Sequence, residues 1–191
     1  MPPTDAPDPP DPPASPSGIA VPIGIPPAIA RIRDRWDRAA RDGARPHVTV
    51  LYPFLPSPAL TASVRAALVG IAATVEPFDL RFERVRRFDD GVVWLEPDPT
   101  EPFAALTAAV ARRWPAYPPY GGMFDEVIVH LTVVEARTRD APLGDIEHET
   151  SRHLPFTARA ERLEVWRQDA DGRWHPHWRI PLGRGPALRQ R

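Results

Sequence analysis

Two short strings of the same pattern contain the residues most able to do chemistry in this chain. The first is His47-Val48-Thr49-Val50, the second is His130-Leu131-Thr132-Val133, and both lie in apolar runs that predict buried strands. Alternate residues of a strand share a face, so each string presents an imidazole and a hydroxyl on one side. Brought together, two such strands would place a proton acceptor, a proton donor and two hydroxyl donors around one small anion. This set of groups suits phosphoester chemistry without a metal.

A purely structural interpretation of the two strings is also available. Both histidines could be satisfied strand residues, and both threonines could be present only because β-branched side chains favour strands. The sequence around the strings repeats as well as the strings themselves, which favours a shared site over coincidence.

The two strings lie in two units for which the sequence predicts the same five elements. The order in each unit is a strand, a helix, the strand that carries the string, a second helix and a last strand. The first unit spans about residues 19–88 and the second about residues 91–182. In the first unit the pattern predicts a strand over 19–25, a helix ending at Gly43, a strand over 46–54, a helix from Ser57 through Val75 and a strand over 78–87. The second unit follows a turn at Asp89-Asp90-Gly91. There the pattern predicts a strand over 92–96, a helix from Thr100 to Trp114, a strand over 127–135 and a helix over 143–153. It then predicts one strand over 156–167 with a bulge near Glu161, and a last strand over 174–182.

The ends of the chain have a different composition. Residues 1–18 are mostly Pro, Ala, Ser and Asp and are expected to be disordered or extended, because they cannot bury a core. Residues 183–191 are expected to form a flexible tail. Between these ends, residues 19–182 are predicted to form a single bilobal domain.

Composition excludes several kinds of site. The 191 residues contain no cysteine, so disulfides, thiolate metal sites and cysteine nucleophiles are ruled out. All 24 basic residues are arginine, which leaves no lysine nucleophile or phosphate-loop lysine. The formal net charge of −1 argues against a protein that coats nucleic acid non-specifically. No segment has the features of a transmembrane span or secretory signal, so we expect a cytoplasmic protein that contacts no membrane.

The two strings and their context resemble the two-histidine (2H) phosphoesterase superfamily, in its 2′-5′ RNA ligase-like or cyclic phosphodiesterase-like branch. The paired His-Φ-Thr-Φ signature matches, where Φ is apolar, as do the segments Arg45 to Phe54 and Tyr120 to Asp125 around the two strings. The likeness covers roughly residues 19–182. One small departure is Val129, where that branch often has proline before the second histidine.

The resemblance implies a bilobal α+β fold of duplicated units, with an antiparallel sheet in each lobe and the active site in a central cleft. It implies metal-independent catalysis on a 2′,3′-cyclic phosphate or a 2′-5′ linkage, with no cofactor. His47 and His130 would be general acid and base, in an order that the sequence leaves open, and Thr49 and Thr132 would bind the phosphate.

Further substrate contacts and partners are predicted around the two strings. Arg45 could meet phosphate, and Tyr117, Tyr120 and Phe124 lie in a Pro/Gly-rich loop that could stack a base. The expected partner is a 2′,3′-cyclic nucleotide or an RNA end, without DNA-specific contact, and a monomer is favoured. RNA 2′-5′ ligation or 2′-5′ phosphodiester cleavage remains an alternative, as does a non-catalytic module that binds an RNA end or nucleotide.

The other four histidines are weaker candidates. His175 and His177 alternate on one predicted strand, but no third metal ligand accompanies them at a useful spacing. His148 and His153 are five residues apart, which is not the spacing of a zinc-protease helix, and are expected at the surface.

Overall fold

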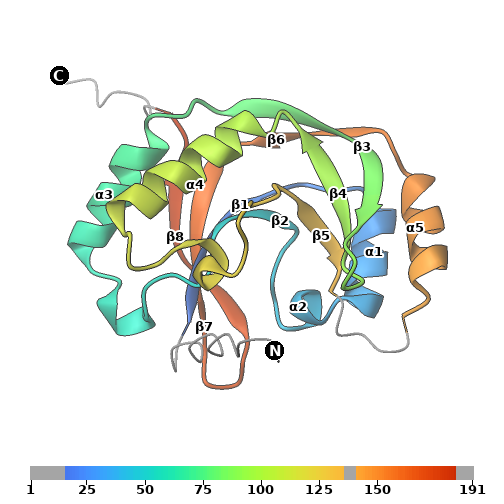
Figure 1. The fold of residues 1–191 in the computed structure, drawn as a ribbon, viewed down its shortest axis with the longest axis horizontal. Helices are drawn as coiled ribbons and strands as arrows, with labels where there is room; N and C mark the ends of the chain where they lie inside the picture. The colour runs from blue at the N-terminus through green and yellow to red at the C-terminus, as the bar shows by residue number, and fades with distance from the viewer. Residues whose placement is uncertain (1–15, 136–140, 184–191) are drawn as a thin grey trace, which may run out of the picture.

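The strands predicted around both strings belong to one curled antiparallel sheet (Figure 1). The computed structural model describes residues 16–135 and 141–183, and in this part of the chain eight strands pair in the order β6-β3-β4-β5-β2-β1-β7-β8. Their bounds are β1 Ser17–Pro22, β2 His47–Leu51, β3 Phe78–Arg87, β4 Val93–Asp98, β5 Leu131–Val134, β6 Phe156–Ala160, β7 Arg162–Gln168 and β8 Trp174–Pro181.

The sheet consists of two four-stranded halves, and each half contains strands of both predicted units, because β3 of the first unit pairs with β4 and β6 while β7 of the second unit pairs with β1. One half is β6-β3-β4-β5 and the other is β2-β1-β7-β8, and they meet where β2 pairs with β5 at Val48 and Leu131. The α+β class and the antiparallel pairing are therefore confirmed. The two halves share one continuous sheet at this junction, so the two strings lie side by side on neighbouring strands.

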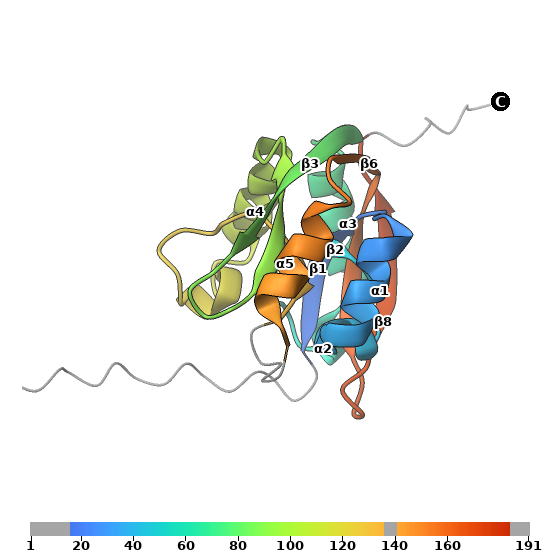
Figure 2. The ribbon, with the colours of Figure 1, turned by 90° about the vertical axis from the view of Figure 1, so that its right-hand side faces the viewer.

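Helices cover the two halves in pairs. The helices are α1 Pro27–Trp36, α2 Arg38–Arg41, α3 Ala62–Ala72, α4 Glu101–Arg113 and α5 Leu143–Ser151, with short 3-10 turns η1 Ser57–Ala59 and η2 Pro119–Gly122. Helices α3 and α4 pack together and against β8 and β2, while α1 and α5 pack together and against β5 and β3 (Figures 1 and 2). Each string-bearing strand is thus covered by a helix of the other unit.

The apolar residues of the two strings anchor the core. Val48, Val50, Leu131 and Val133 are almost completely buried. On α4, Phe103, Leu106 and Val110 recur at helical spacing and are also fully buried. Burying each such side chain contributes roughly 1.5–3 kcal/mol, so the core fixes both strands firmly.

Two helix boundaries differ from the sequence-based prediction because other residues cap the helices. Ser57 lies in the 3-10 turn, and Thr61 caps α3 by accepting a hydrogen bond from the Val64 amide at 3.4 Å. The first helix ends before Asp37, whose side chain accepts from the Ala40 amide at 3.2 Å and starts the short helix α2.

The prediction of one bulged strand over 156–167 was wrong. The chain forms two strands separated at Glu161, because β6 pairs with β3 in one half of the sheet and β7 pairs with β1 and β8 in the other. The Asp89-Asp90-Gly91 turn is confirmed: Gly91 has φ of +96°, a left-handed value that glycine adopts without strain.

The first strand begins earlier than predicted. β1 starts at Ser17, whose side chain is buried and donates to the Leu55 carbonyl. The remainder of the Pro-rich segment, residues 1–15, and nearly all of the predicted tail, residues 184–191, lie outside the described residues. Among the helices that the structure describes, none is long and apolar enough to cross a bilayer.

Candidate active site

The pairing of β2 with β5 brings the two strings together. Val48 pairs with Leu131, and continuing this register by one residue in each direction sets His47 opposite Thr132 and Thr49 opposite His130. All four polar side chains lie on the face opposite the buried Val48 and Leu131. The result is a compact square in which histidines occupy one diagonal and threonines the other.

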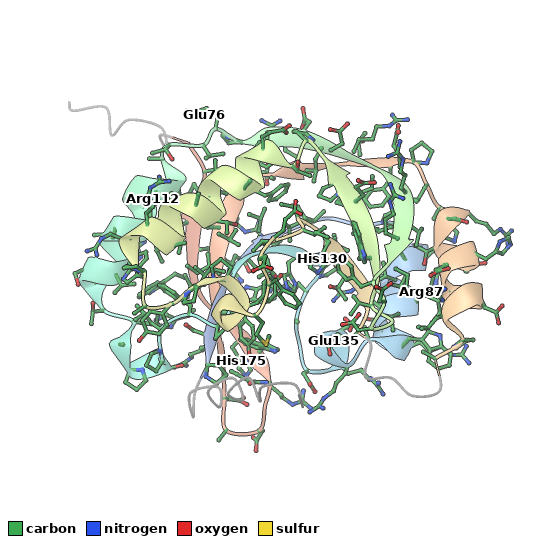
Figure 3. The ribbon with its side chains drawn as sticks, viewed as in Figure 1. Glu76, Arg87, Arg112, His130, Glu135 and His175 are labelled. Atoms are coloured by element: carbon green, nitrogen blue, oxygen red, sulfur yellow. The ribbon has the colours of Figure 1, made fainter. Side chains whose placement is uncertain are left out.

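Each histidine is held by the same local contact. The Nδ1 atom of His47 lies 2.7 Å from the Arg45 carbonyl oxygen, and that of His130 lies 2.8 Å from the Ile128 carbonyl oxygen. A carbonyl only accepts, so each Nδ1 must carry the proton and donate it. The Nε2 atom of the neutral ring is then a proton acceptor, which is the state a general base needs. Figure 3 labels His130 near the middle of the molecule, beside the start of β5.

The surroundings keep both histidines uncharged at neutral pH. Burial lowers the pKa of His47 to about 4, with the Arg45 carbonyl opposing the shift and the charges of Arg33 and His130 adding to it. Burial also lowers the pKa of His130, while its hydrogen bond to Ile128 and the charge of Asp90 raise it. The site is therefore asymmetric: a cation acts on His47 and an anion on His130.

Both histidines contact aromatic rings. The sequence analysis did not predict these rings as part of the site. Trp166 of β7 meets His47 edge-on, with ring centroids 4.8 Å apart. Phe88 and Trp94 meet His130 at 5.2 Å and 5.8 Å. Trp94 pairs with Thr132 across β4 and β5, which explains its place on the same face. These rings restrict the orientation of each imidazole and lower the local polarity.

The loop before the second string contributes one residue to the square. A hydrogen bond joins the side chains of Tyr120 and Thr49, and burial raises the pKa of the Tyr120 phenol. The Tyr120 amide also donates to the Tyr52 carbonyl at 2.6 Å, and its φ of +53° is unusual for a residue other than glycine. Phe124 lies edge-on to Tyr120 at 5.6 Å and is 57% exposed.

Tyr117 has a different environment from the one predicted. Its ring lies 6.3 Å from that of Phe54, which is completely buried, and it packs against the hydrophobic core. The loop thus directs Tyr120 to the site and packs the Tyr117 ring against the core.

Arg45 is exposed and lies two residues before His47, just ahead of β2, where His47 and Thr49 define the face of the square. A second arginine, Arg162, lies on this face at the start of β7 and donates from Nε to the buried Glu164 carboxylate at 2.8 Å. Strand alternation over 162–166 is the signal that could have identified this group, because apolar Leu163 and Val165 separate Arg162, Glu164 and Trp166.

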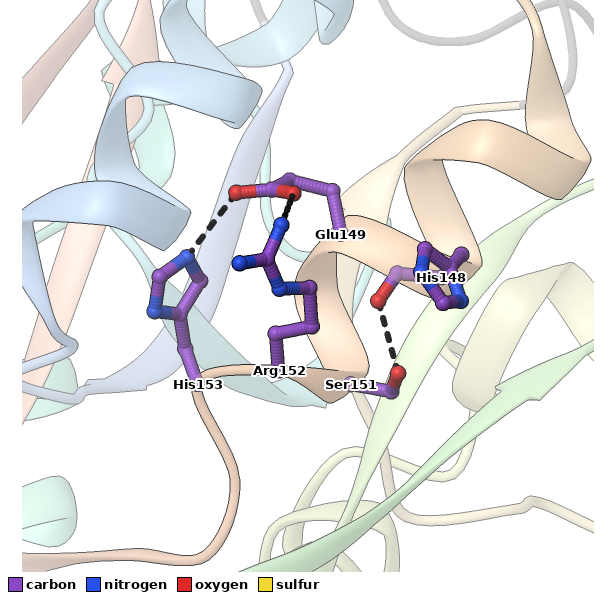
Figure 4. Close-up of polar contacts among 5 residues, drawn as sticks. All are labelled: His148, Glu149, Ser151, Arg152 and His153. Carbon is purple, nitrogen blue, oxygen red and sulfur yellow. Dashed lines mark hydrogen bonds and ion pairs between the residues drawn. The ribbon is translucent and has the colours of Figure 1, made fainter.

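The remaining histidines make local contacts away from the square. Near the end of α5, the Glu149 carboxylate contacts Arg152 and His153, while Ser151 donates to the His148 carbonyl (Figure 4). His175 pairs with Asp169 at 2.7 Å, and His177 packs on Trp178. Among the described residues, no three His, Asp or Glu side chains gather in a group that could hold a metal ion.

The family of the chain follows from comparison with known proteins. The sequence model of the 2′-5′ RNA ligase superfamily matches residues 21–178, which is most of the chain and includes both strings. The protein therefore belongs to this superfamily of two-histidine phosphoesterase-like and ligase-like enzymes, and the resemblance seen in the sequence is confirmed.

One of the solved structures that are similar to this chain supports the fold. TT0787 of Thermus thermophilus is 17% identical, with a TM-score of 0.57, and the match covers 89% of this chain and 100% of that one. E. coli LigT complexed with 3′-AMP is also 17% identical, with a TM-score of 0.49 over 90% of this chain and 99% of the other. Among curated proteins, no sequence matches this chain.

Proposed function

We propose that this protein hydrolyses 2′,3′-cyclic phosphodiesters, of small nucleotides or of RNA ends, without a metal. The observation that carries the proposal is the square of His47, Thr132, Thr49 and His130 set by the β2–β5 register. Opening a cyclic phosphodiester requires a base for the attacking water and an acid for the leaving ribose oxygen. Two imidazoles on one diagonal supply both, one on each side of a phosphorus atom placed above the square.

The electrostatic asymmetry favours His47 as the base and His130 as the acid. His47 Nε2 takes a proton from water as the water oxygen bonds to phosphorus. The bond from phosphorus to the 2′ or 3′ oxygen breaks, and that oxygen receives the proton from His130 Nε2. The charge of Asp90 and that of the bound phosphate both favour a protonated His130, whereas Arg33 favours a neutral His47.

The two threonines stabilise the negative charge that builds on the phosphate. Their hydroxyls lie on the other diagonal and are suited to donate to the two non-bridging oxygens of the phosphate. Removing one such donor typically costs about 10²–10³-fold in rate. The Tyr120 hydroxyl, already bonded to Thr49, orients that donor, and the exposed ring of Phe124 offers a surface on which the base can stack.

The test is hydrolysis of 2′,3′-cyclic nucleoside monophosphates in the presence of EDTA by the wild type, His47→Ala and His130→Ala. Turnover should survive EDTA and fall by about 10²–10⁴-fold in each variant, since each removes one positioned acid or base. His148→Ala is the matched control, because its ring lies on α5 outside the site, and it should retain wild-type turnover.

The outcomes separate the possible functions. Turnover abolished by EDTA would overturn the metal-free mechanism. A folded wild type that hydrolyses neither cyclic mononucleotides nor RNA ending in a cyclic phosphate would overturn the hydrolase and leave the non-catalytic binding module. Joining of RNA ends at a 2′-5′ linkage would show that the same two histidines operate in the ligation direction.

A further inference from the structure

A hollow of about 700 Å³ adjoins the square on the His47 side. Pro22, which pairs with His47 across β1 and β2, is one of the residues that line it. Arg45 and Pro46, the two residues before His47, line it as well. The hollow therefore lies next to the His47 corner of the square, and its lining begins with residues that neighbour His47 in the sheet and in the sequence.

Arginines dominate the charge of this hollow. Arg45, Arg159 and Arg162 line it, and Glu161 is the acidic residue among its lining residues. Arg159 is held from outside by Asp79 at 2.7 Å. The hollow is thus suited to an anion, and its walls come from the end of β1 with the segment after it, the two residues before β2, β6 and the start of β7.

The position of Arg162 in the sheet suits it to bind an anion in this hollow. Continuing the register of β1 with β7 sets Arg162 opposite Pro22, so His47, Pro22 and Arg162 form one row across three neighbouring strands. Glu164 is fully buried and holds the Arg162 Nε at 2.8 Å. Among the described residues, Glu164 is the carboxylate that pairs with Arg162, and the Arg162 side chain is 35% exposed.

Glu164 orients Arg162, but the single negative charge of Glu164 is shared with other arginines. Its carboxylate also accepts from the Trp166 indole at 2.8 Å and faces Arg179 at 3.5 Å. The charge of Arg45 also contributes to the low pKa of Glu164, so Arg45 acts on the same group. The Glu164 carboxylate is thus shared by Arg162, Arg179 and, at longer range, Arg45. Because one negative charge faces three positive charges, the Arg162 end of the row has a net positive charge.

We infer that Arg162 and Arg45 form a subsite for a second phosphate of the substrate, on the 5′ oxygen of the nucleotide whose 2′ or 3′ phosphate occupies the square. The inference rests on the proposed function for the position of the first phosphate. It narrows the substrate class to nucleotides with a phosphate at both ends of the ribose. This second phosphate is either the 5′-monoester of a free nucleotide or the phosphodiester that links the last two nucleotides of an RNA.

Direct binding to the full chain tests the subsite without requiring turnover. The ligands are 2′-AMP and 3′-AMP, the corresponding 2′,5′- and 3′,5′-bisphosphates of adenosine, and adenine dinucleotides with the same terminal phosphate. Calorimetry should show the bisphosphate or the dinucleotide binding about tenfold or more tightly than the matching monophosphate, since charge-assisted hydrogen bonds to phosphate are of that strength. Whether bisphosphate or dinucleotide gains more identifies the source of the second phosphate.

Arg162→Gln and Arg45→Gln should each reduce this preference several-fold, and the double variant should abolish it. Arg112→Gln, on the outer end of α4 away from His130 (Figure 3), is the matched control and should keep it. Arg162→Gln leaves Glu164 its contacts with Trp166 and Arg179, and a thermal melt checks that the fold is intact.

Two results would overturn the subsite: a wild type that binds neither the bisphosphate nor the dinucleotide more tightly than the matching monophosphate, or a preference that survives in the double variant. The hydrolysis assay reports separately on the proposed function. Binding that depends on Arg162 in a protein without turnover supports the subsite and overturns the hydrolase. Turnover without any preference for a second phosphate supports the hydrolase and overturns the subsite.

Discussion

At the scale of single residues, the hydrogen bonds of the two histidines limit what each can do. Both Nδ1 atoms donate to backbone carbonyls, so all proton exchange with a substrate must pass through Nε2. The same contact in both strings means that the two groups differ only through their neighbours. Arg33 lies within electrostatic range of His47, and Asp90 within range of His130.

This difference predicts the dependence of the rate on pH. A base must be unprotonated, so kcat/KM should rise as pH increases through the pKa of His47, which is about 4. An acid must be protonated, so kcat/KM should fall as pH increases through the pKa of His130, which is lowered from 6.5. The bell should therefore have its maximum on the acid side of neutrality, and kcat should peak at higher pH because bound phosphate favours protonated His130.

Measuring kcat/KM and kcat separately from about pH 3.5 to about pH 9 checks this prediction. His47→Ala should flatten the acid limb and His130→Ala the alkaline limb of whatever activity remains. If the two limbs exchange, His130 is the base and the roles proposed above are reversed. A profile without either limb would remove the histidines from the chemistry.

At the scale of elements, β7 carries three site-facing residues, Arg162, Glu164 and Trp166, between apolar ones. Burial raises the pKa of Glu164, but the hydrogen bonds from Trp166 and Arg162 and the charge of Arg162 outweigh it, and the net pKa is lowered. The ionised carboxylate thus holds Trp166 against His47 and gives Arg162 its direction. The strand acts as one supporting unit for the His47 side of the site.

Glu164→Gln should therefore destabilise the protein at neutral pH. A neutral amide accepts more weakly than a carboxylate, and the expected loss is about 1–3 kcal/mol. A group with a lowered folded pKa stabilises above its unfolded pKa and ceases to do so as pH falls through the folded pKa. The difference between wild type and variant should accordingly shrink as the pH falls below the ordinary pKa of a glutamate, about 4.5.

Urea unfolding at neutral pH and at decreasing pH values measures this difference. Glu161→Gln, an exposed carboxylate just before the same strand, is the matched control and should change stability by less than about 0.5 kcal/mol. A Glu164→Gln penalty that persists unchanged at about pH 3 would show that shape, and not charge, is what this residue supplies.

The same elements show what the sequence could and could not predict. The strands carrying the two strings, the Asp89-Asp90-Gly91 turn and most helices follow from local periodicity, because alternation and turn residues act over a few positions. The break at Glu161 does not, because it depends on β6 and β7 pairing with strands far away in the chain. The contact of Trp166 with His47 was missed for the same reason, since the two rings are far apart in the sequence and meet only in the folded sheet.

At the scale of the whole molecule, the two units depend on each other. The strand with the first string is backed by α4 of the second unit, and the strand with the second string is backed by α1 of the first. Thr107 of α4 also donates to the Val50 carbonyl at 2.9 Å. Neither unit can cover its own string-bearing strand, so the site exists only when both units are folded together.

This exchange of helices predicts a single cooperative unfolding transition and a shared response to a defect in α4. Leu106 is fully buried on α4, and Leu106→Ala should cost about 2–5 kcal/mol through lost burial and a cavity. Far-ultraviolet circular dichroism follows the helices, and tryptophan fluorescence follows the six tryptophans, which include Trp94 and Trp166 on the two sides of the square. Both signals should shift together in the variant, whereas the exposed α4 substitution Arg112→Gln should shift neither. Two separated transitions would mean that the units fold independently, and the square would then be a contact between two domains and not part of one sheet.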